Sequence, residues 1–83
     1  MWKLIIPNRV KNFIKKLPEK YRTSAISALE DIKTDPRIGK SLSRELKGLY
    51  SYQFGLYRII YKIDVKSKTV SVLKINHRRI VYN

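Results

Sequence analysis

The spacing of apolar residues changes once along this chain, near Gly48. Between residues 10 and 32, apolar side chains recur three and four positions apart, which places them on one face of a helix. From residue 50 onward they alternate with polar side chains, and this is the period of a strand with one buried face. A helical half followed by a strand half is typical of an α+β fold, in which helices cover one face of a sheet.

Proline residues divide the helical half into its elements. An apolar run at 2–6 ends at a proline and predicts an N-terminal strand. A helix is expected at about 8–17, with Asn8 as its N-cap, and Pro18 separates it from a second helix at 19–34. The two helices should therefore form a hairpin.

The strand half predicts three strands in sequence. The region 37–48 has little periodicity and is expected to be a basic loop. Gly55 marks a tight reversal between the first two strands. The expected strands are 50–54, 56–64 and 69–75. We predict that they form a three-stranded antiparallel meander, and that this meander and the N-terminal strand make one sheet with the helices on one face.

Alternation along the central strand separates its aromatic residues from its cationic ones. The side chains expected to pack against the helices are Tyr57, Ile59, Tyr61 and Ile63. Arg58 is then left with Ile60 and Lys62 on the opposite face, which we expect to be open. Two interpretations of Arg58 stay open: a structural ion pair with Glu45 or Asp64, or an anion-binding group.

The chain is strongly basic, and its charges are unevenly placed. It has 19 Lys and Arg residues against 6 Asp and Glu residues, which gives a formal net charge of +13. Residues 1–18 and all residues after Asp64 carry no acidic side chain. If the two ends meet in the fold, they should form a positive surface that binds a polyanion. A cationic surface that only keeps the protein soluble is the alternative, and an acidic protein partner fits either interpretation.

Length and composition exclude several other classes of protein. We expect a single domain over residues 1–83, because the chain is short and has no linker-like stretch. The sequence contains no cysteine, which excludes disulfides and Cys-based metal sites and fits a reducing cytoplasm. Its apolar runs are too short for a membrane span or a signal peptide, so we expect a soluble cytoplasmic protein without a membrane partner. A phosphate loop and a Ser/His/Asp set are also absent from the sequence, and no cofactor is expected.

Three short motifs give the chain a resemblance to a known family. They are Leu-Lys-Gly-Leu at 46–49, Tyr-Arg-Ile-Ile-Tyr at 57–61 and His-Arg-Arg-Ile-Val-Tyr at 77–82. In this order and spacing they resemble the RelE/ParE toxin superfamily of toxin–antitoxin systems, nearer the RelE branch. The order of strand, helical hairpin and three strands is also that of the family.

The resemblance implies a ribosome-dependent endoribonuclease that cuts messenger RNA in the decoding site. The 2′-hydroxyl of the RNA would be the nucleophile, and the reaction would need no metal or other cofactor. The implied partners are the ribosome, its mRNA and a cognate acidic antitoxin, with which the toxin can form larger assemblies. An acidic antitoxin also fits the positive charge of the chain.

The family motifs imply roles for individual residues. Arg58 would stabilise the scissile phosphate, Arg78 would act near the leaving oxygen, and Tyr82 would stack on the substrate or orient it. Arg79 is expected to contact the RNA backbone. We expect further RNA contacts from Arg44, Lys47, Lys62 and Lys74.

The chain also departs from the family pattern. Well-studied members carry basic residues on the strand after the Leu-Lys-Gly-Leu motif, where this chain has Ser51 and Gln53. His77 is then the one remaining candidate for a general base, since histidine ordinarily titrates near neutral pH. A surface or packing role for His77 is the alternative.

Three hypotheses about function follow from these observations. The first is the ribosome-dependent ribonuclease, and the second is a ParE-like toxin that poisons DNA gyrase without cutting RNA. The third is a toxin homologue that binds RNA or the ribosome and has weak or no catalytic activity.

Overall fold

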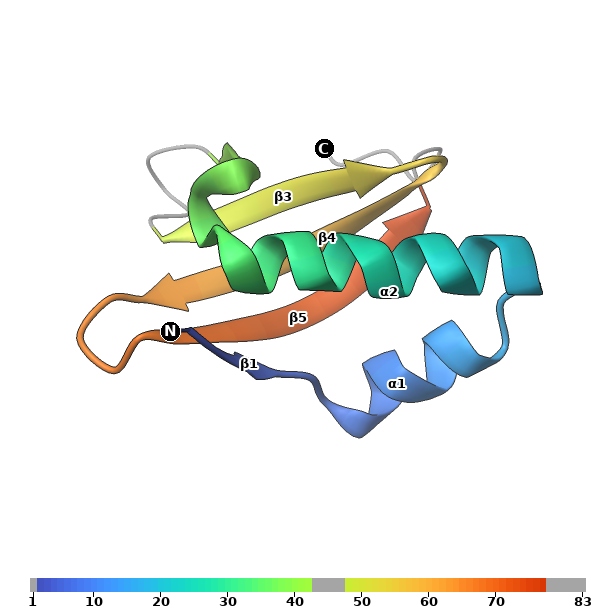
Figure 1. The fold of residues 1–83 in the computed structure, drawn as a ribbon, viewed down its shortest axis with the longest axis horizontal. Helices are drawn as coiled ribbons and strands as arrows, with labels where there is room; N and C mark the ends of the chain where they lie inside the picture. The colour runs from blue at the N-terminus through green and yellow to red at the C-terminus, as the bar shows by residue number, and fades with distance from the viewer. Residues whose placement is uncertain (1, 43–47, 78–83) are drawn as a thin grey trace.

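A computed structural model describes residues 2–42 and 48–77 (Figure 1). The elements in chain order are β1 (Lys3–Ile5), α1 (Asn8–Lys15), α2 (Glu19–Thr34), the 3₁₀ helix η1 (Pro36–Ile38), β2 (Lys40–Ser41), β3 (Leu49–Phe54), β4 (Tyr57–Asp64) and β5 (Thr69–His77). The strands form one sheet in the order β1-β5-β4-β3-β2. β1 runs parallel to β5 and the other neighbours are antiparallel, so the predicted α+β architecture is confirmed.

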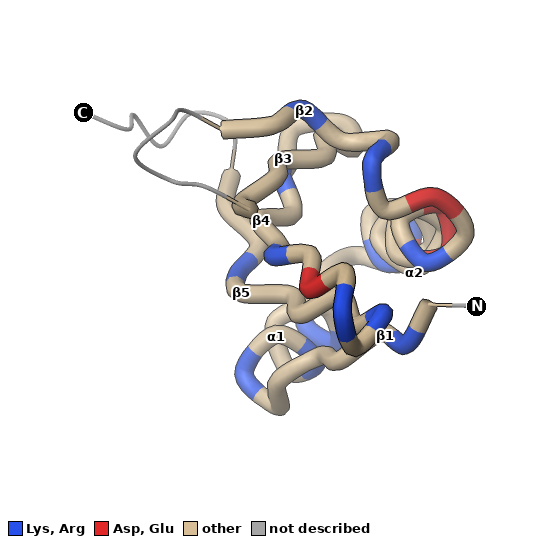
Figure 2. The backbone as a smooth tube through the Cα atoms, turned by 90° about the vertical axis from the view of Figure 1, so that its left-hand side faces the viewer, with Lys and Arg blue, Asp and Glu red and all other residues tan. Residues whose placement is uncertain are grey.

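The helices pack against one face of this sheet, as predicted (Figure 2). The core between them contains fully buried residues from both layers, namely Ala25, Ile32, Ile59, Tyr61 and Val70. No helix in the described part of the chain is long and apolar enough to cross a membrane.

Helix α2 has the predicted bounds, but α1 differs at both ends. It ends at Lys15, although Leu17 is buried in the core as its spacing predicted. Asn8 was wrongly predicted as the N-cap, because the cap residue is Pro7. The extended backbone of Pro7 directs its carbonyl oxygen toward the first turn, where it accepts hydrogen bonds from the N–H groups of Val10 and Lys11, both at 3.0 Å.

The region predicted as a basic loop contains two short elements. The first is η1, whose N-cap is Asp35, and the carboxylate of Asp35 accepts a hydrogen bond from the N–H of Arg37 at 3.3 Å. In β2, Lys40 pairs with Ser51 and Ser41 pairs with Tyr50. A two-residue strand is too short to show a hydrophobic period, and this is why the sequence pattern missed it.

The buried Tyr61 ties η1 and β2 to the sheet. Its hydroxyl donates a hydrogen bond to the carbonyl oxygen of Pro36 and accepts one from the N–H of Gly39 at 3.1 Å. Its ring stacks on Tyr50, with 5.7 Å between the ring centroids. Burial raises the pKa of the Tyr61 hydroxyl to about 12, so it remains a donor at physiological pH. Tyr61 thus has the core position predicted for it and also holds the segment that precedes β2.

Gly39 allows this close approach, and Gly39→Ala is expected to destabilise the protein by about 1–3 kcal/mol, the range for overpacking. A Cβ at this position would overlap the Tyr61 hydroxyl and lie 2.9 Å from the carbonyl oxygen of Ser51. Urea unfolding followed by circular dichroism measures the change. The same substitution should cost less in a Tyr61→Phe background, and equal costs in both backgrounds would contradict the predicted clash.

A β-bulge in β5 adjusts which residues reach the core. Ile60 pairs with Lys74 and Tyr61 pairs with Val72, so Leu73 between them is the extra residue. Val72 and Ile75 can therefore both be buried although an odd number of positions separates them. The backbone carbonyl of Leu73 accepts a hydrogen bond from the Arg9 guanidinium of α1.

Candidate functional site

The faces of β4 separate Tyr57 from Arg58, as the alternation predicted. The ring of Tyr57 contacts rings from both helices and from both neighbouring strands, with centroid distances of 5.2–6.1 Å to Phe13, Tyr21, Phe54 and His77. Tyr57 therefore faces the helices. Since neighbouring residues of a strand point to opposite faces, the Arg58 side chain lies on the other side of the sheet.

On that side, Arg58 lines a pocket of about 470 Å³ at the edge of the sheet. Strand pairing explains which polar residues share it: Arg58 pairs with Gln53 across β3 and β4, and Lys40 pairs with Ser51 across β2 and β3. All four of these residues line the pocket, together with Ile38, Gly39, Leu42 and Tyr52. Its lining therefore includes the cationic side chains of Lys40 and Arg58 and the neutral polar side chains of Ser51 and Gln53.

The surroundings of Arg58 favour anion binding over a structural ion pair. Arg58 and Asp64 are six residues apart on one strand, a separation of about 20 Å, so they cannot form an ion pair. Glu45, the other predicted partner, lies outside the described residues. No carboxylate is among the described residues that line the pocket. This environment suits an anion-binding guanidinium, because nothing described there would compete with the anion.

The prediction of a fully open face was wrong at Ile60. Ile60 is only 7% exposed, and it stands apart from the main core cluster. It occupies the middle of the sheet, where Ser51 and Lys74 flank it on the neighbouring strands. Lys62 and Lys74, both predicted to contact RNA, are exposed on β4 and β5.

His77 is not next to Arg58 in the pocket. It pairs with Tyr57 and its ring packs edge-on against the Tyr57 ring, with 5.2 Å between the centroids. The residue that pairs with Arg58 on β5 is Asn76. The packing alternative for His77 therefore has direct geometric support, whereas a base acting beside Arg58 does not.

The remaining predicted site residues fall on parts of the chain that the structure does not describe. These are Arg44 and Lys47 before β3, and Arg78, Arg79 and Tyr82 after β5. Lys40 lines the Arg58 pocket but was not among the predicted site residues, because its region was predicted only as a basic loop. Its position opposite Ser51 depends on the pairing of β2, which no sequence pattern indicated.

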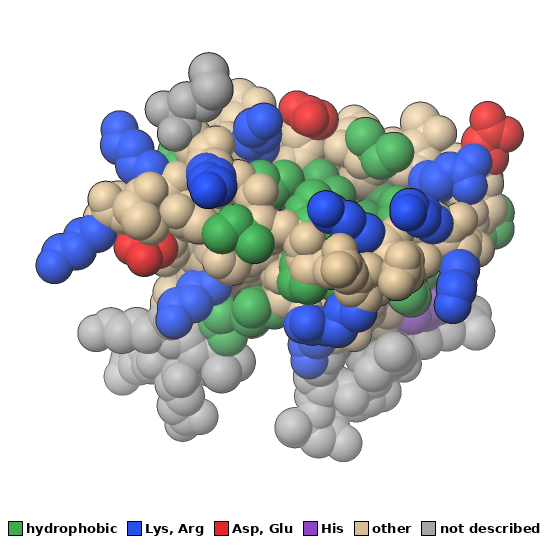
Figure 3. All heavy atoms as spheres, turned by 90° about the horizontal axis from the view of Figure 1, so that it is seen from below, with side chains coloured by type: hydrophobic (Ala, Val, Ile, Leu, Met, Phe, Trp, Pro, Cys, Tyr) green, Lys and Arg blue, Asp and Glu red, His purple; other side chains and the backbone are tan. Residues whose placement is uncertain are grey.

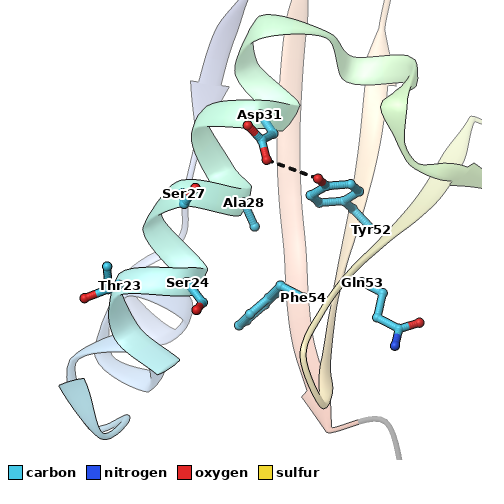
Figure 4. Close-up of a pocket in the computed structure, with 8 residues that line it drawn as sticks. All are labelled: Thr23, Ser24, Ser27, Ala28, Asp31, Tyr52, Gln53 and Phe54. Atoms are coloured by element: carbon cyan, nitrogen blue, oxygen red, sulfur yellow. Dashed lines mark hydrogen bonds between the residues drawn. The ribbon is translucent and has the colours of Figure 1, made fainter. Parts of the chain in front are cut away.

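A second pocket, of about 390 Å³, lies between α2 and β3 and has a different character (Figure 4). In this pocket the Tyr52 hydroxyl donates a hydrogen bond to the Asp31 carboxylate at 3.1 Å. Partial burial, followed by the effects of Asp31, raises the pKa of Tyr52. Because this pocket includes a carboxylate and no Lys or Arg among its described residues, it is less suited to a polyanion than the Arg58 pocket.

The N-terminal segment lies beside the segment that follows Asp64, as the charge pattern required for a positive surface. β1 pairs with β5, and Arg9 of α1 hydrogen-bonds to β5. We define the basic face by exposed cationic residues of α1, β1 and the turn between β4 and β5: Lys3, Arg9, Lys11, Lys15, Lys66 and Lys68. Figure 3 shows Lys and Arg side chains spread over this side of the molecule, with the few acidic side chains near its outline.

Comparison with known proteins gives consistent results. The model of the family described as the ParE toxin of the type II toxin–antitoxin system parDE matches residues 4–82. Toxin RelG of Mycobacterium tuberculosis is 39% identical over 69 residues, which are 81% of this chain and 79% of RelG.

Solved structures show the same fold. A chain of the toxin–antitoxin complex RelBE2 from Mycobacterium tuberculosis superposes with a TM-score of 0.78 at 32% identity, and the match covers 93% of this chain and 98% of that one. The isolated E. coli RelE toxin superposes with a TM-score of 0.80 at 19% identity, covering 98% of this chain and 88% of that one. The latter likeness concerns the fold alone.

Proposed function

This chain belongs to the RelE/ParE family of type II toxins, and we propose that it is a ribosome-dependent endoribonuclease that cleaves mRNA. The observation that carries the proposal is the Arg58 pocket, which combines two cationic side chains with no described carboxylate. The similarity to the RelG toxin and to a chain of the RelBE2 complex supports the RelE branch.

The proposed reaction transfers the scissile phosphorus from one oxygen of the RNA to another. The 2′-oxygen loses its proton and bonds to phosphorus, while the bond from phosphorus to the 5′-oxygen breaks and that oxygen gains a proton. The products are a 2′,3′-cyclic phosphate and a 5′-hydroxyl end. Negative charge grows on the phosphoryl oxygens during the attack, and a guanidinium fixed beside them lowers the barrier.

Three of the predicted residues have a place in the cleavage step of this proposal. Arg58 would contact the phosphoryl oxygens with its planar fork of donors. Arg78 would act near the leaving oxygen, and Tyr82 would stack on a base of the RNA. The ribosome would hold the mRNA in a bent conformation that aligns the 2′-oxygen with the phosphorus.

An acidic antitoxin is part of the same proposal. The RelBE2 structure is that of a toxin–antitoxin complex, so that relative binds an antitoxin. The net charge of +13 on this chain makes an acidic protein an electrostatically complementary partner. We therefore propose that a cognate antitoxin neutralises this toxin in the cytoplasm, where its ribosomal target is found.

One observation favours a second candidate function. The family model that matches the chain is described for ParE toxins. A ParE-like toxin would poison DNA gyrase without cutting RNA, and the two candidates predict different lesions.

The test is to add the purified chain to a bacterial translation extract and to map the 5′ ends of the mRNA fragments. The proposal predicts cuts at fixed positions within codons, only on mRNA bound to ribosomes and unaffected by EDTA pre-treatment of the chain alone. A matched reaction should contain gyrase and supercoiled DNA. DNA breaks without mRNA cuts would favour the ParE-like function, and ribosome binding without either lesion would favour the non-catalytic homologue.

A further inference from the structure

We propose that Lys40 of β2 binds the scissile phosphate together with Arg58, and so supplies the positive charge that β3 lacks at Ser51 and Gln53. This inference rests on the proposed ribonuclease function. It assigns a role to a residue that the family motifs do not mark.

The strand register carries the argument. Lys40 and Ser51 are directly paired, so their side chains share one face and their Cβ atoms are about 5 Å apart. Ser51 is directly opposite Ile60, two positions from Arg58 on the same strand. Arg58 is therefore a diagonal neighbour of Ser51, at roughly 7–8 Å. The Lys40 ammonium group therefore lies on the same side of the sheet as the charge of a basic residue at position 51 would.

The pocket provides the common space for these two cations. Lys40 and Arg58 both line it, and Ser51 and Gln53 lie between them. Small or neutral side chains at these two positions leave room for a phosphate group to contact both cations. Lys40 is exposed, so its ammonium group is accessible to RNA.

The segment that carries Lys40 is held in place on both sides. Before it, the N–H of Gly39 donates to the Tyr61 hydroxyl at 3.1 Å. After it, the N–H of Leu42 donates to the carbonyl oxygen of Leu49 at 2.9 Å. Lys40 therefore extends from a backbone that is fixed relative to Arg58, which is what a phosphate-binding residue requires.

The two cations would play complementary parts. The Arg58 guanidinium offers two parallel donors to phosphoryl oxygens, whereas the Lys40 ammonium acts as a compact point charge. Together they would offset charge that increases as the 2′-oxygen attacks. Lys40 should therefore affect the cleavage step more than it affects association with the ribosome.

The first experiment measures single-turnover cleavage on programmed ribosomes for Lys40→Ala, with Lys33→Ala as the control. Lys33 is an exposed lysine in the last turn of α2 and does not line the Arg58 pocket. We expect Lys40→Ala to lower the rate by about tenfold to a hundredfold, and Lys33→Ala to leave it unchanged. Equal rates for both variants would overturn the assignment of Lys40.

The second experiment moves the charge across the strand pair. In the Lys40→Ala background, Ser51→Lys should recover at least about tenfold of the lost rate, because the new ammonium enters the same pocket. Loss of activity in Lys40→Ala without recovery by Ser51→Lys, in proteins with unchanged circular dichroism, would overturn the shared phosphate position. A control Lys33→Ala/Ser51→Lys variant measures what the added lysine does by itself.

A binding measurement separates the two proposals. The mRNA for it carries a 2′-deoxy nucleotide at the cleavage position and therefore cannot be cut. Lys40→Ala should bind ribosomes with this mRNA nearly as tightly as the parent chain, and a loss in binding equal to the loss in rate would contradict a role in the cleavage step. Absence of cleavage by the parent chain would instead contradict the proposed ribonuclease function.

Discussion

Replacing Arg58 with alanine is expected to lower the single-turnover rate of mRNA cleavage by about a hundredfold or more, the scale for losing one donor to a developing oxyanion. The guanidinium lines a pocket that also contains Lys40 and no described carboxylate, so its removal takes away one of two charges that can face a phosphate. Arg58→Lys should recover only part of the loss, because an ammonium group lacks the two-point fork. Rapid mixing of purified protein with programmed ribosomes gives the rate.

The fold must survive for this result to be informative. The aromatic contacts of β4 on the helix side come from Tyr57 and Tyr61, and neither substitution at Arg58 alters them. Thermal unfolding should therefore stay close to that of the parent chain. An Arg58→Ala protein that unfolds, with no separate loss of activity at low temperature, would show that the arginine is structural.

His77→Gln provides a contrast at the end of the neighbouring strand. The substitution removes an edge-to-face ring contact with Tyr57, which is worth about 0.5–1.5 kcal/mol. Because His77 shares a face with Tyr57 and not with Arg58, we expect stability to fall while the pH dependence of cleavage stays the same. If the substitution instead flattened the low-pH limb of the rate profile, His77 would be the general base.

The parts of the fold that follow from the sequence are those with a long hydrophobic period. Helix α2 matches its predicted bounds because its apolar residues recur over four turns between two prolines. Strands β3 and β4 match closely because alternation continues through both and Gly55, with φ of 55°, makes the reversal between them. Tyr57 and Tyr61 face the core for the same reason.

The parts that escaped prediction depend on contacts between distant segments. β2 forms because its two residues pair with β3. In addition, the Tyr61 hydroxyl accepts a hydrogen bond from the N–H of Gly39, directly before β2. The bulge at Leu73 reverses the alternation of β5, so counting positions along the sequence would have given a wrong face to part of that strand. Local patterns contain no information about either feature.

The candidate site divides along the same line. Arg58 could be assigned to the face opposite the helices from alternation alone, and the structure agrees. The position of Lys40 beside it could not be deduced, since that requires the register between β2 and β3. Similarly, His77 belongs in sequence to the same motif as the family's arginines, but pleating turns it toward Tyr57. Consecutive residues of a strand, such as Tyr57 and Arg58, point to opposite faces of the sheet.

The basic face should make ribosome binding strongly dependent on salt. If its six cationic side chains each neutralise about one phosphate, the affinity should fall about a thousandfold between 50 and 200 mM monovalent salt, through counterion release. Filter binding of labelled chain to ribosomes, over a series of salt concentrations, measures the slope. A nearly flat dependence would remove the polyanion interpretation of the charge.

Two matched lysines locate this effect on the molecule. Lys15 and Lys33 are exposed lysines in the last turns of α1 and α2, so they differ mainly in the side of the protein that they occupy. In Figure 2, the acidic positions lie mainly on α2, and α1 carries only basic ones. Lys15→Ala should lower the slope of log affinity against log salt by about one, and Lys33→Ala should leave it unchanged. Equal effects would mean that net charge, and not the basic face, drives association. A larger effect of Lys15→Ala would place the ribosomal RNA on the side of the molecule that α1 occupies.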